Sequence, residues 1–286
     1  MRVVTLNFWG TEPPLDRRVA LAAAQLKILD PDVICLQEAR PVNGSSGITT
    51  ADLLAEQLEM HAVYETSCRW REGEYEGLPS GQEGLAIVSR HKPLSSQRLE
   101  LPHGRVGETR QLLSVQLPTG SDPVWVHTTH LHYRLDDGVA REAQVLAIDE
   151  AIRKLGRDKT SAPQILCGDF NATPDSDEMR FLRGLTTLEG RRTHFQDAWL
   201  RHHRECQPGD GPAQGITWSS ENELTRPLRS LDIDRRIDYI YVTSRKKDGR
   251  ATILDCFVAL TEREEPGGIC ASDHYAVVAD IQVVPN

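Results

Sequence analysis

The chain has 286 residues, of which 39% are hydrophobic and 26% are charged, and its formal net charge at pH 7 is -9. This composition is typical of a globular protein with a large core. We expect a cytoplasmic protein, because no stretch approaches the ~18 apolar residues of a membrane span and the first residues lack the pattern of a signal peptide. The acidic charge argues against a nucleic acid partner without excluding one.

The six cysteines do not indicate a structural zinc site, because none of them form a Cys-x-x-Cys pair. Cys35 and Cys167 lie within apolar runs, where we expect them to be small buried hydrophobic residues. The even number leaves disulfide bonds open, although a cytoplasmic chain of this size does not need them.

Apolar runs and turn residues divide the first third of the chain into alternating elements. Asp16 is placed to cap a helix with an apolar stripe, and Asp30-Pro31 is expected to end it. In order, we expect a strand over residues 3–7, a helix over 16–29, a strand over 32–38, a helix starting at Thr49 or Thr50, and strands over 62–68 and 83–90.

Strands follow one another directly in the rest of the chain. A regular alternation of strand and helix is absent, which favours mixed and largely antiparallel sheets. In order, we expect strands over residues 94–101, 111–117 and 124–130, a helix over 139–155, a strand over 164–167, a helix from about 177, and strands over 236–242, 253–260 and 275–283.

The stretch Gly168-Asp169-Phe170-Asn171 places a carboxylate and a carboxamide where a buried strand leaves the core. Catalytic groups are often found at such points, because the strand holds them while the loop leaves them accessible. Gly168 also allows another group to approach the backbone closely. Asp and Asn equally favour turns through their own side chains, so this stretch alone does not decide between a turn and a site.

Other polar residues also stand at the ends of apolar strands. Asp238 lies inside an apolar run, where a carboxylate is costly unless it is paired or hydrogen-bonded. His130 and His132 share a strand face and could form a zinc pair, although no third ligand is marked by spacing, and a buried structural role for His274 is equally open. The full set is Asn7, Glu38, His130, Asp169, Asn171, Asp238, Asp273 and His274.

Seven short motifs in a fixed order, spanning Thr5 to His274, resemble those of the endonuclease/exonuclease/phosphatase superfamily. The resemblance implies a single domain over residues 1–286. It also implies a four-layer α/β sandwich, in which two mixed, mostly antiparallel β-sheets are flanked by helices. The motifs are Thr5-Leu6-Asn7, Leu36-Gln37-Glu38, residues 83–90, Thr129-His130-Leu131, residues 168–171, residues 236–240 and Ser272-Asp273-His274.

The same resemblance implies a divalent cation, Mg2+ or Mn2+, held by oxygen donors. Glu38 resembles the principal metal ligand, with Asn7 beside it and Asp273 completing the shell directly or through water. Asp169 resembles the residue that orients or deprotonates the attacking water. Asn171 is expected to hold that carboxylate or the phosphate by hydrogen bonds.

The resemblance further implies two histidines that contact the phosphate. His274 is expected to donate to a phosphate oxygen, and Asp238 to hold its ring and favour its protonated form. His130 is expected to be the second such histidine, oriented by Glu83. Among residues near these motifs (Trp9, Arg40, Trp70, His132, Tyr133, Arg134 and Trp218), only Trp9 and His132 are proposed as substrate contacts, with packing an equal alternative.

We expect a divalent-metal-dependent hydrolase of phosphate esters. The acidic charge and the lack of a basic stripe favour a small-molecule, lipid-head-group or sugar-phosphate substrate. A DNA or RNA endonuclease or exonuclease of the same fold is the alternative. A binding module without activity is disfavoured, because Glu38, Asp169 and His274 are all present.

Overall fold

The structure is a computed structural model that describes residues 1–42, 47–71, 80–104, 108–120, 122–156, 162–203, 214–225, 233–264 and 268–285. Cys206 lies outside the described residues. Cys35 and Cys167 are buried as expected, and both are free thiols. Within the described ranges, no helix is long and apolar enough to cross a membrane.

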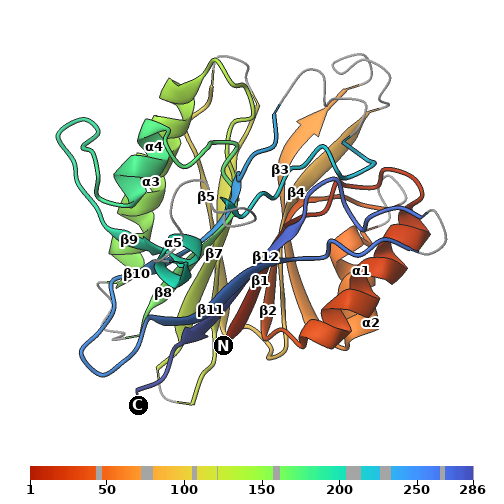
Figure 1. Ribbon diagram of the computed structural model, residues 1–286, viewed down its shortest axis with the longest axis horizontal. Helices are drawn as coiled ribbons and strands as arrows, with labels where there is room; N and C mark the ends of the chain where they lie inside the picture. Colours follow the sequence, from red (N-terminus) through yellow and green to blue (C-terminus); the bar gives the residue numbers. More distant parts are fainter. Residues whose placement is uncertain are drawn as a thin grey trace.

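The first of two six-stranded sheets has the order β11-β12-β1-β2-β4-β3 (Figure 1). β1 and β2 run parallel, and every other pair in this sheet is antiparallel. Its strands are β1 (Arg2–Asn7), β2 (Val33–Ala39), β3 (His61–Trp70), β4 (Gly81–Ser89), β11 (Thr252–Ala259) and β12 (Ala276–Gln282).

The second sheet has the order β5-β6-β7-β8-β10-β9, and only its β7 and β8 are parallel. β9 is short and lies at the edge. The strands are β5 (Ser95–Glu100), β6 (Gln111–Leu117), β7 (Val124–His130), β8 (Gln164–Asp169), β9 (Phe195–Asp197) and β10 (Asp238–Thr243).

Helices cover the outer faces of the two sheets. α1 (Leu15–Leu29) and α2 (Thr50–Leu58) lie against the first sheet, while α3 (Gly138–Gly156) and α4 (Asp177–Leu182) lie against the second (Figure 1). Three buried apolar clusters fill the spaces between these layers, one between the sheets and one under each helical layer. The predicted four-layer α/β sandwich is confirmed.

Most predicted elements are present, with ends shifted by one or two residues. Asp16 does not cap α1, because the helix already begins at Leu15 after Pro14. α2 begins with a capping box in which Thr49 and Asp52 satisfy each other's backbone N–H groups. β9 and the following α5 (Ala198–His202) were not predicted, because both are short and lack a periodic pattern.

The pairing pattern brings the predicted polar residues to one end of the sandwich. The parallel register places Asn7 opposite Gln37, and His130 opposite Asp169. Asp238, at the start of the antiparallel β10, also pairs with Asp169. Polar bonds also cross between the sheets, among them the one from Nε2 of Gln37 to the hydroxyl of Thr128 at 2.8 Å.

Candidate active site

A cavity of about 280 Å³ lies where these strand ends meet, and both sheets contribute to its walls. Seven of the predicted site residues line it, Glu83 among them. Its lining consists of Asn7, Glu38, Arg40, Cys68, Trp70, Glu83, Glu108, Arg110, His130, Tyr133, Asp169, Asn171 and His274.

Glu38 reaches the cavity through an irregularity in β2. The pairing with β4 shifts between Leu36 and Ala39, and Glu38 adopts a left-handed φ of 53°. A bulge of this kind redirects a side chain at a strand end. The carboxylate of Glu38 then accepts a hydrogen bond from Asn7 at 3.0 Å and lies 3.5 Å from the guanidinium of Arg40.

Asn7 stands between the carboxylates of the two sheets. Its Oδ1 accepts a hydrogen bond from the backbone N–H of Trp9 at 3.0 Å. Its Nδ2 donates to Glu38 at 3.0 Å and to Asp169 at 3.1 Å. In this arrangement Asn7 orients both carboxylates, and its predicted contribution of an oxygen ligand to a metal stays a prediction.

The position of Asp169 depends on the glycine before it. Gly168 has a φ of 150°, and a Cβ there would lie 2.1 Å from the carbonyl oxygen of Thr129, so β8 can approach β7 only without a side chain. Oδ1 of Asp169 accepts from the backbone N–H of Asn171 at 2.9 Å. The side chain of Asn171 donates to the carbonyl of Leu131 at 3.2 Å, which fixes the turn.

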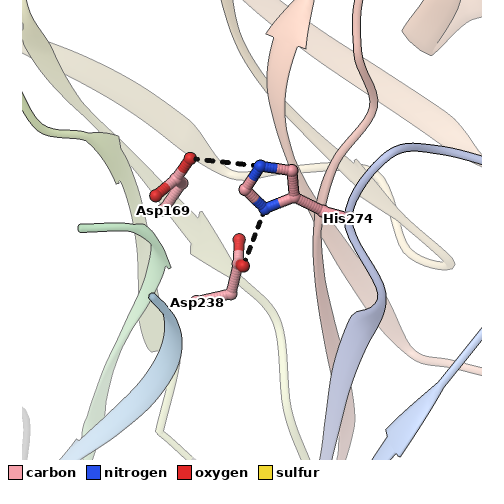
Figure 2. Close-up of side chains that lie close together, drawn as sticks. All are labelled: Asp169, Asp238 and His274. Atoms are coloured by element: carbon pink, nitrogen blue, oxygen red, sulfur yellow. Dashed lines mark hydrogen bonds and ion pairs between the residues drawn. The ribbon is translucent and has the colours of Figure 1, made fainter. Parts of the chain in front are cut away.

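Two imidazoles flank the carboxylate of Asp169. Nδ1 of His274 is 2.8 Å from Oδ2 of Asp238, and its Nε2 lies 3.9 Å from Oδ2 of Asp169 (Figure 2). Nε2 of His130 lies 3.5 Å from the same Asp169 oxygen. The imidazole of His274 is therefore held between two carboxylates, and Asp169 is the common neighbour of both histidines.

The surroundings shift the pKa values of His274 and His130 in opposite directions. Burial opposes the charged form of His274, but three nearby carboxylates, with Asp238 contributing most, hold its pKa well above the ordinary value. Burial, with a further contribution from Arg110, holds the pKa of His130 well below the ordinary value. At neutral pH the site therefore contains one imidazolium and one neutral imidazole.

The two guanidinium groups of the cavity are already neutralised by carboxylates. Arg40 forms ion pairs with Glu12 at 3.1 Å, Glu38 at 3.5 Å and Glu83 at 3.0 Å. Arg110 pairs with its neighbour two residues earlier at 2.6 Å. Because Glu83 accepts from Arg40, its predicted role in orienting His130 stays a prediction.

The donor set of the cavity fits a hard divalent cation. Glu38, Glu83 and Asp169 present carboxylate oxygens, which Mg2+ and Mn2+ prefer. A second arrangement also has ligand spacing, because single ligand atoms of Asp169, Asp238 and His274 lie within 4.8 Å of one another. The 2.8 Å hydrogen bond between Asp238 and His274 favours the carboxylates of Glu38 and Glu83 as the metal side of the site.

Four predicted residues, all within the described ranges, lie outside the cavity lining, and one of them, Asp238, contacts the lining residue His274. His132 is fully buried, with its ring 3.6 Å from Glu108 and 3.4 Å from Asp137. Trp9 is half-buried against Arg18, and Asp273 is half-buried and accepts from the hydroxyl of Ser272 at 3.2 Å.

Several residues that line the cavity were not predicted from the sequence. Cys68, Glu108 and Arg110 were not considered, while Arg40, Trp70 and Tyr133 were noted without a role. For Glu108 and Arg110, the sequence signal is their spacing, because the two residues stand two positions apart just before the predicted strand 111–117.

The pH dependence of stability should show whether Glu38 binds the metal. Burial and the charge of Glu83 raise the pKa of Glu38 to about 8. Without metal, this carboxylate stabilises the fold in its protonated form, so that stability is lost as the pH rises through about 8. Because Mg2+ needs the ionised form, we expect it to raise Tm more at about pH 9 than at about pH 6.

Thermal unfolding with Mg2+ and with EDTA at both pH values measures this difference. The Glu38→Gln variant is the control, since it keeps the shape of the side chain but cannot ionise. An equal Mg2+ effect in wild type and in this variant would exclude Glu38 as the ligand.

Comparisons with known proteins identify the family of this chain. The sequence profile of the Endonuclease/Exonuclease/phosphatase family matches residues 4–274. Protein angel homolog 2 from Bos taurus is 27% identical over 181 residues, and its counterpart from Mus musculus is 26% identical over 183 residues. These matches cover 58% of this chain and 31% of each relative, so the chain spans about a third of the curated relatives' length.

Solved structures share the whole fold at low sequence identity. An endonuclease/exonuclease/phosphatase from Beutenbergia cavernae is 23% identical, with a TM-score of 0.70 over 99% of this chain and 71% of that chain. TDP2 from D. rerio, complexed with single strand DNA product, is 19% identical, with a TM-score of 0.69 over 98% and 97% of the two chains. The human Nocturnin catalytic domain, with bound sulfate anion, is 18% identical, with a TM-score of 0.69 over 99% and 93%. The chain therefore belongs to the Endonuclease/Exonuclease/phosphatase family.

Proposed function

We propose that the protein hydrolyses a phosphate ester of a small molecule, such as a sugar phosphate or a lipid head group, with Mg2+ or Mn2+ bound on the Glu38 side of the cavity. The observation that carries the proposal is the charge balance of the cavity. Among the residues that the structure describes, four carboxylates line it against two guanidinium groups that are already paired, so an anionic phosphate needs an added cation to enter.

When bound, the divalent cation would neutralise the phosphoryl oxygens and polarise the phosphorus. Asp169 would orient the attacking water and take its proton. Burial, with the charge of Asp238 next, raises the pKa of Asp169 to about 6, so that it is ionised at neutral pH and still a stronger base than an ordinary aspartate. The backbone N–H of Asn171 and the amide of Asn7 hold this carboxylate in place.

His274 would stabilise the charge that develops on the phosphate. Its Nδ1 is held by Asp238, which leaves Nε2 facing Asp169 and the cavity. As an imidazolium it donates a hydrogen bond to a non-bridging oxygen, where electrostatic stabilisation has its largest effect. His130, on the other side of Asp169, offers a second and neutral contact.

The size and lining of the cavity favour a compact substrate. A volume of about 280 Å³ is at the small end of ligand pockets. Trp70 and Tyr133, one from each side of the sandwich, add aromatic surface beside the charged pair of Glu108 and Arg110. With their cations paired, the described residues of the cavity offer no row of positive charges for the successive phosphates of a polymer.

A nuclease acting on DNA or RNA is the second candidate. Its support is the likeness in fold to TDP2, which has been observed with a single strand DNA product. Aromatic residues such as Trp70 and Tyr133 would suit stacking of a terminal base. For the nuclease candidate, only one nucleotide of the polymer would have to enter the cavity.

A substrate panel separates the two candidates. The panel comprises plasmid DNA, RNA oligonucleotides, bis-p-nitrophenyl phosphate, inositol and choline phospholipids, and sugar phosphates, each with Mg2+, with Mn2+ and with EDTA. We expect the highest kcat/KM on a small phosphate ester and no activity in EDTA. Plasmid nicking at low enzyme concentration that weakens steeply with salt would favour the nuclease, and activity that survives EDTA would contradict the metal-dependent mechanism.

A further inference from the structure

Arg18 of α1 has no exposed surface and is held entirely by backbone carbonyl groups. Its guanidinium makes five hydrogen bonds, all within ordinary distances. The accepting carbonyls belong to Phe8 (2.8 Å), Trp9 (3.2 Å), Gly10 (3.0 Å), Glu12 (3.0 Å) and Ala271 (3.1 Å).

Four of these carbonyls come from the loop that follows β1. Trp9 and Gly10 both adopt left-handed φ angles, 57° and 49°, which turn successive carbonyl oxygens towards one point. Such a convergence of partial negative charges is stable only around a cation with several donors. The guanidinium of Arg18 supplies five N–H groups in one plane, and it also packs on the rings of Phe8 and Trp9 at 5.1 and 5.2 Å.

This loop holds a residue of the active site. The backbone N–H of Trp9 donates to Oδ1 of Asn7, which directs Nδ2 of Asn7 to Glu38 and Asp169. A change in the path of the loop would therefore rotate the amide that orients both carboxylates. Arg18 reaches the site through this chain of contacts and does not line the cavity itself.

The fifth carbonyl belongs to the segment that carries His274. Ala271 is bound by Arg18, and the hydroxyl of the next residue, Ser272, donates to the carbonyl of Asn7 at 2.6 Å. The segment that leads to His274 is thus tied twice to the end of β1. The buried side chain of Arg18 therefore connects the loop that positions Asn7 with the segment that carries His274.

We propose that Arg18 is a positioning residue, which sets the amide of Asn7 and the imidazole of His274 relative to each other for the hydrolysis of the phosphate ester. The proposal rests on the proposed function only for the identity of the reaction. It assigns no direct contact between Arg18 and the substrate. Its consequence is that removing the guanidinium slows the chemical step more than it weakens substrate binding.

The test compares Arg18→Met and Arg18→Lys with wild type, using bis-p-nitrophenyl phosphate and saturating Mn2+. We expect kcat to fall by about 10- to 100-fold in Arg18→Met, because small displacements of catalytic groups have effects of this size. KM should change by less than about threefold. Arg18→Lys should also lose activity, because an ammonium group has three donors and no planar fork, and it cannot bind five carbonyls.

Arg250→Met is the matched control. Arg250 is also a buried arginine, but it is held by the carboxylates of Asp248 and Asp122, neither of which lines the cavity. This variant should lose stability and keep kcat within about twofold of wild type. Circular dichroism at the assay temperature selects folded protein, and Arg18→Lys, which keeps the buried charge, decides the question if Arg18→Met does not fold.

A second readout does not depend on activity. Because Asn7 orients Glu38, calorimetric titration with Mn2+ should show weaker binding, by at least about threefold, in the folded Arg18 variants and not in Arg250→Met. Unchanged kcat in a folded Arg18 variant, or full activity in Arg18→Lys, would overturn the proposal. The wild-type protein serves as the test of the reaction itself. If it shows no activity in the same assay, the proposed function is contradicted, and not the role of Arg18.

Discussion

Replacing Asp169 by asparagine is expected to lower kcat by about 10³-fold, because the variant keeps the shape of the side chain but cannot accept a proton from water. The contacts with Asn7 and Asn171 place this carboxylate at the centre of the cavity, between the two histidines. KM for a small phosphate ester should change much less than kcat, because the loss occurs in the transition state. Steady-state kinetics with Mn2+ at several pH values measures both constants.

The same variant should not be less stable than wild type when metal is absent. Burial and the neighbouring Asp238 raise the pKa of Asp169 to about 6, so the ionised form opposes folding at neutral pH. The folded protein binds the proton more tightly than the unfolded chain, and the resulting stability is lost as the pH rises through about 6. We expect Asp169→Asn in EDTA at neutral pH to have a Tm equal to or above that of wild type.

Asp197→Asn is the control for this experiment. Asp197 is a second buried aspartate at a strand end, but it pairs with Arg236 through two hydrogen bonds and does not line the cavity. Its replacement should cost about 3 kcal/mol of stability and leave kcat unchanged. Substantial activity in Asp169→Asn would show that another group activates the water.

Removal of the partner of His274 should have the second largest effect. We expect Asp238→Asn and His274→Gln each to lower kcat by about 10²-fold, since one group orients and charges the other. The double variant should lose little more than either single variant, because residues that act as a unit are not additive. If the fold-loss of kcat in the double variant equals the product of the two single losses, Asp238 and His274 act independently.

The pH profile gives an independent test of this pair. Burial lowers the pKa of His274, but the surrounding carboxylates, Asp238 first, hold it well above the ordinary value, so that wild-type His274 stays protonated through neutral pH. Asp238→Asn removes the largest favourable charge, and its activity should therefore fall more steeply as the pH rises above about 6.5. His127→Gln serves as the control, because His127 is buried between Ser114 and Gln164, away from the cavity.

Sequence patterns predicted the strands and their polar ends well. The strands over residues 111–117 and 124–130 have the predicted bounds, because turn residues such as Pro118 and Gly120 separate them. The seven motifs also indicated the fold, and they contain the polar residues that the parallel and antiparallel strand pairing places at one end of the sandwich. Short elements such as β9 and α5 are too brief for a period to be detected.

The errors near the site have a common physical cause. His130 and His132 were expected on one face, but β7 ends at His130, and the alternation of side chains does not continue beyond the strand. His132 instead lies buried, with its backbone N–H bound by Gln144 of α3. Contacts between distant segments, such as those of Arg18, depend on the path of the chain in space and leave no local signal.

Polar bonds between the sheets help to decide how the halves of the sandwich are aligned. Apolar contacts between sheets are not directional, so a packed interior alone allows small sliding movements of one sheet over the other. The bonds from Gln37 to Thr128 and from Asn7 to Asp169 are directional, and both lie towards the catalytic end. These bonds therefore fix the position of one sheet relative to the other at the end of the sandwich where the proposed catalytic groups lie.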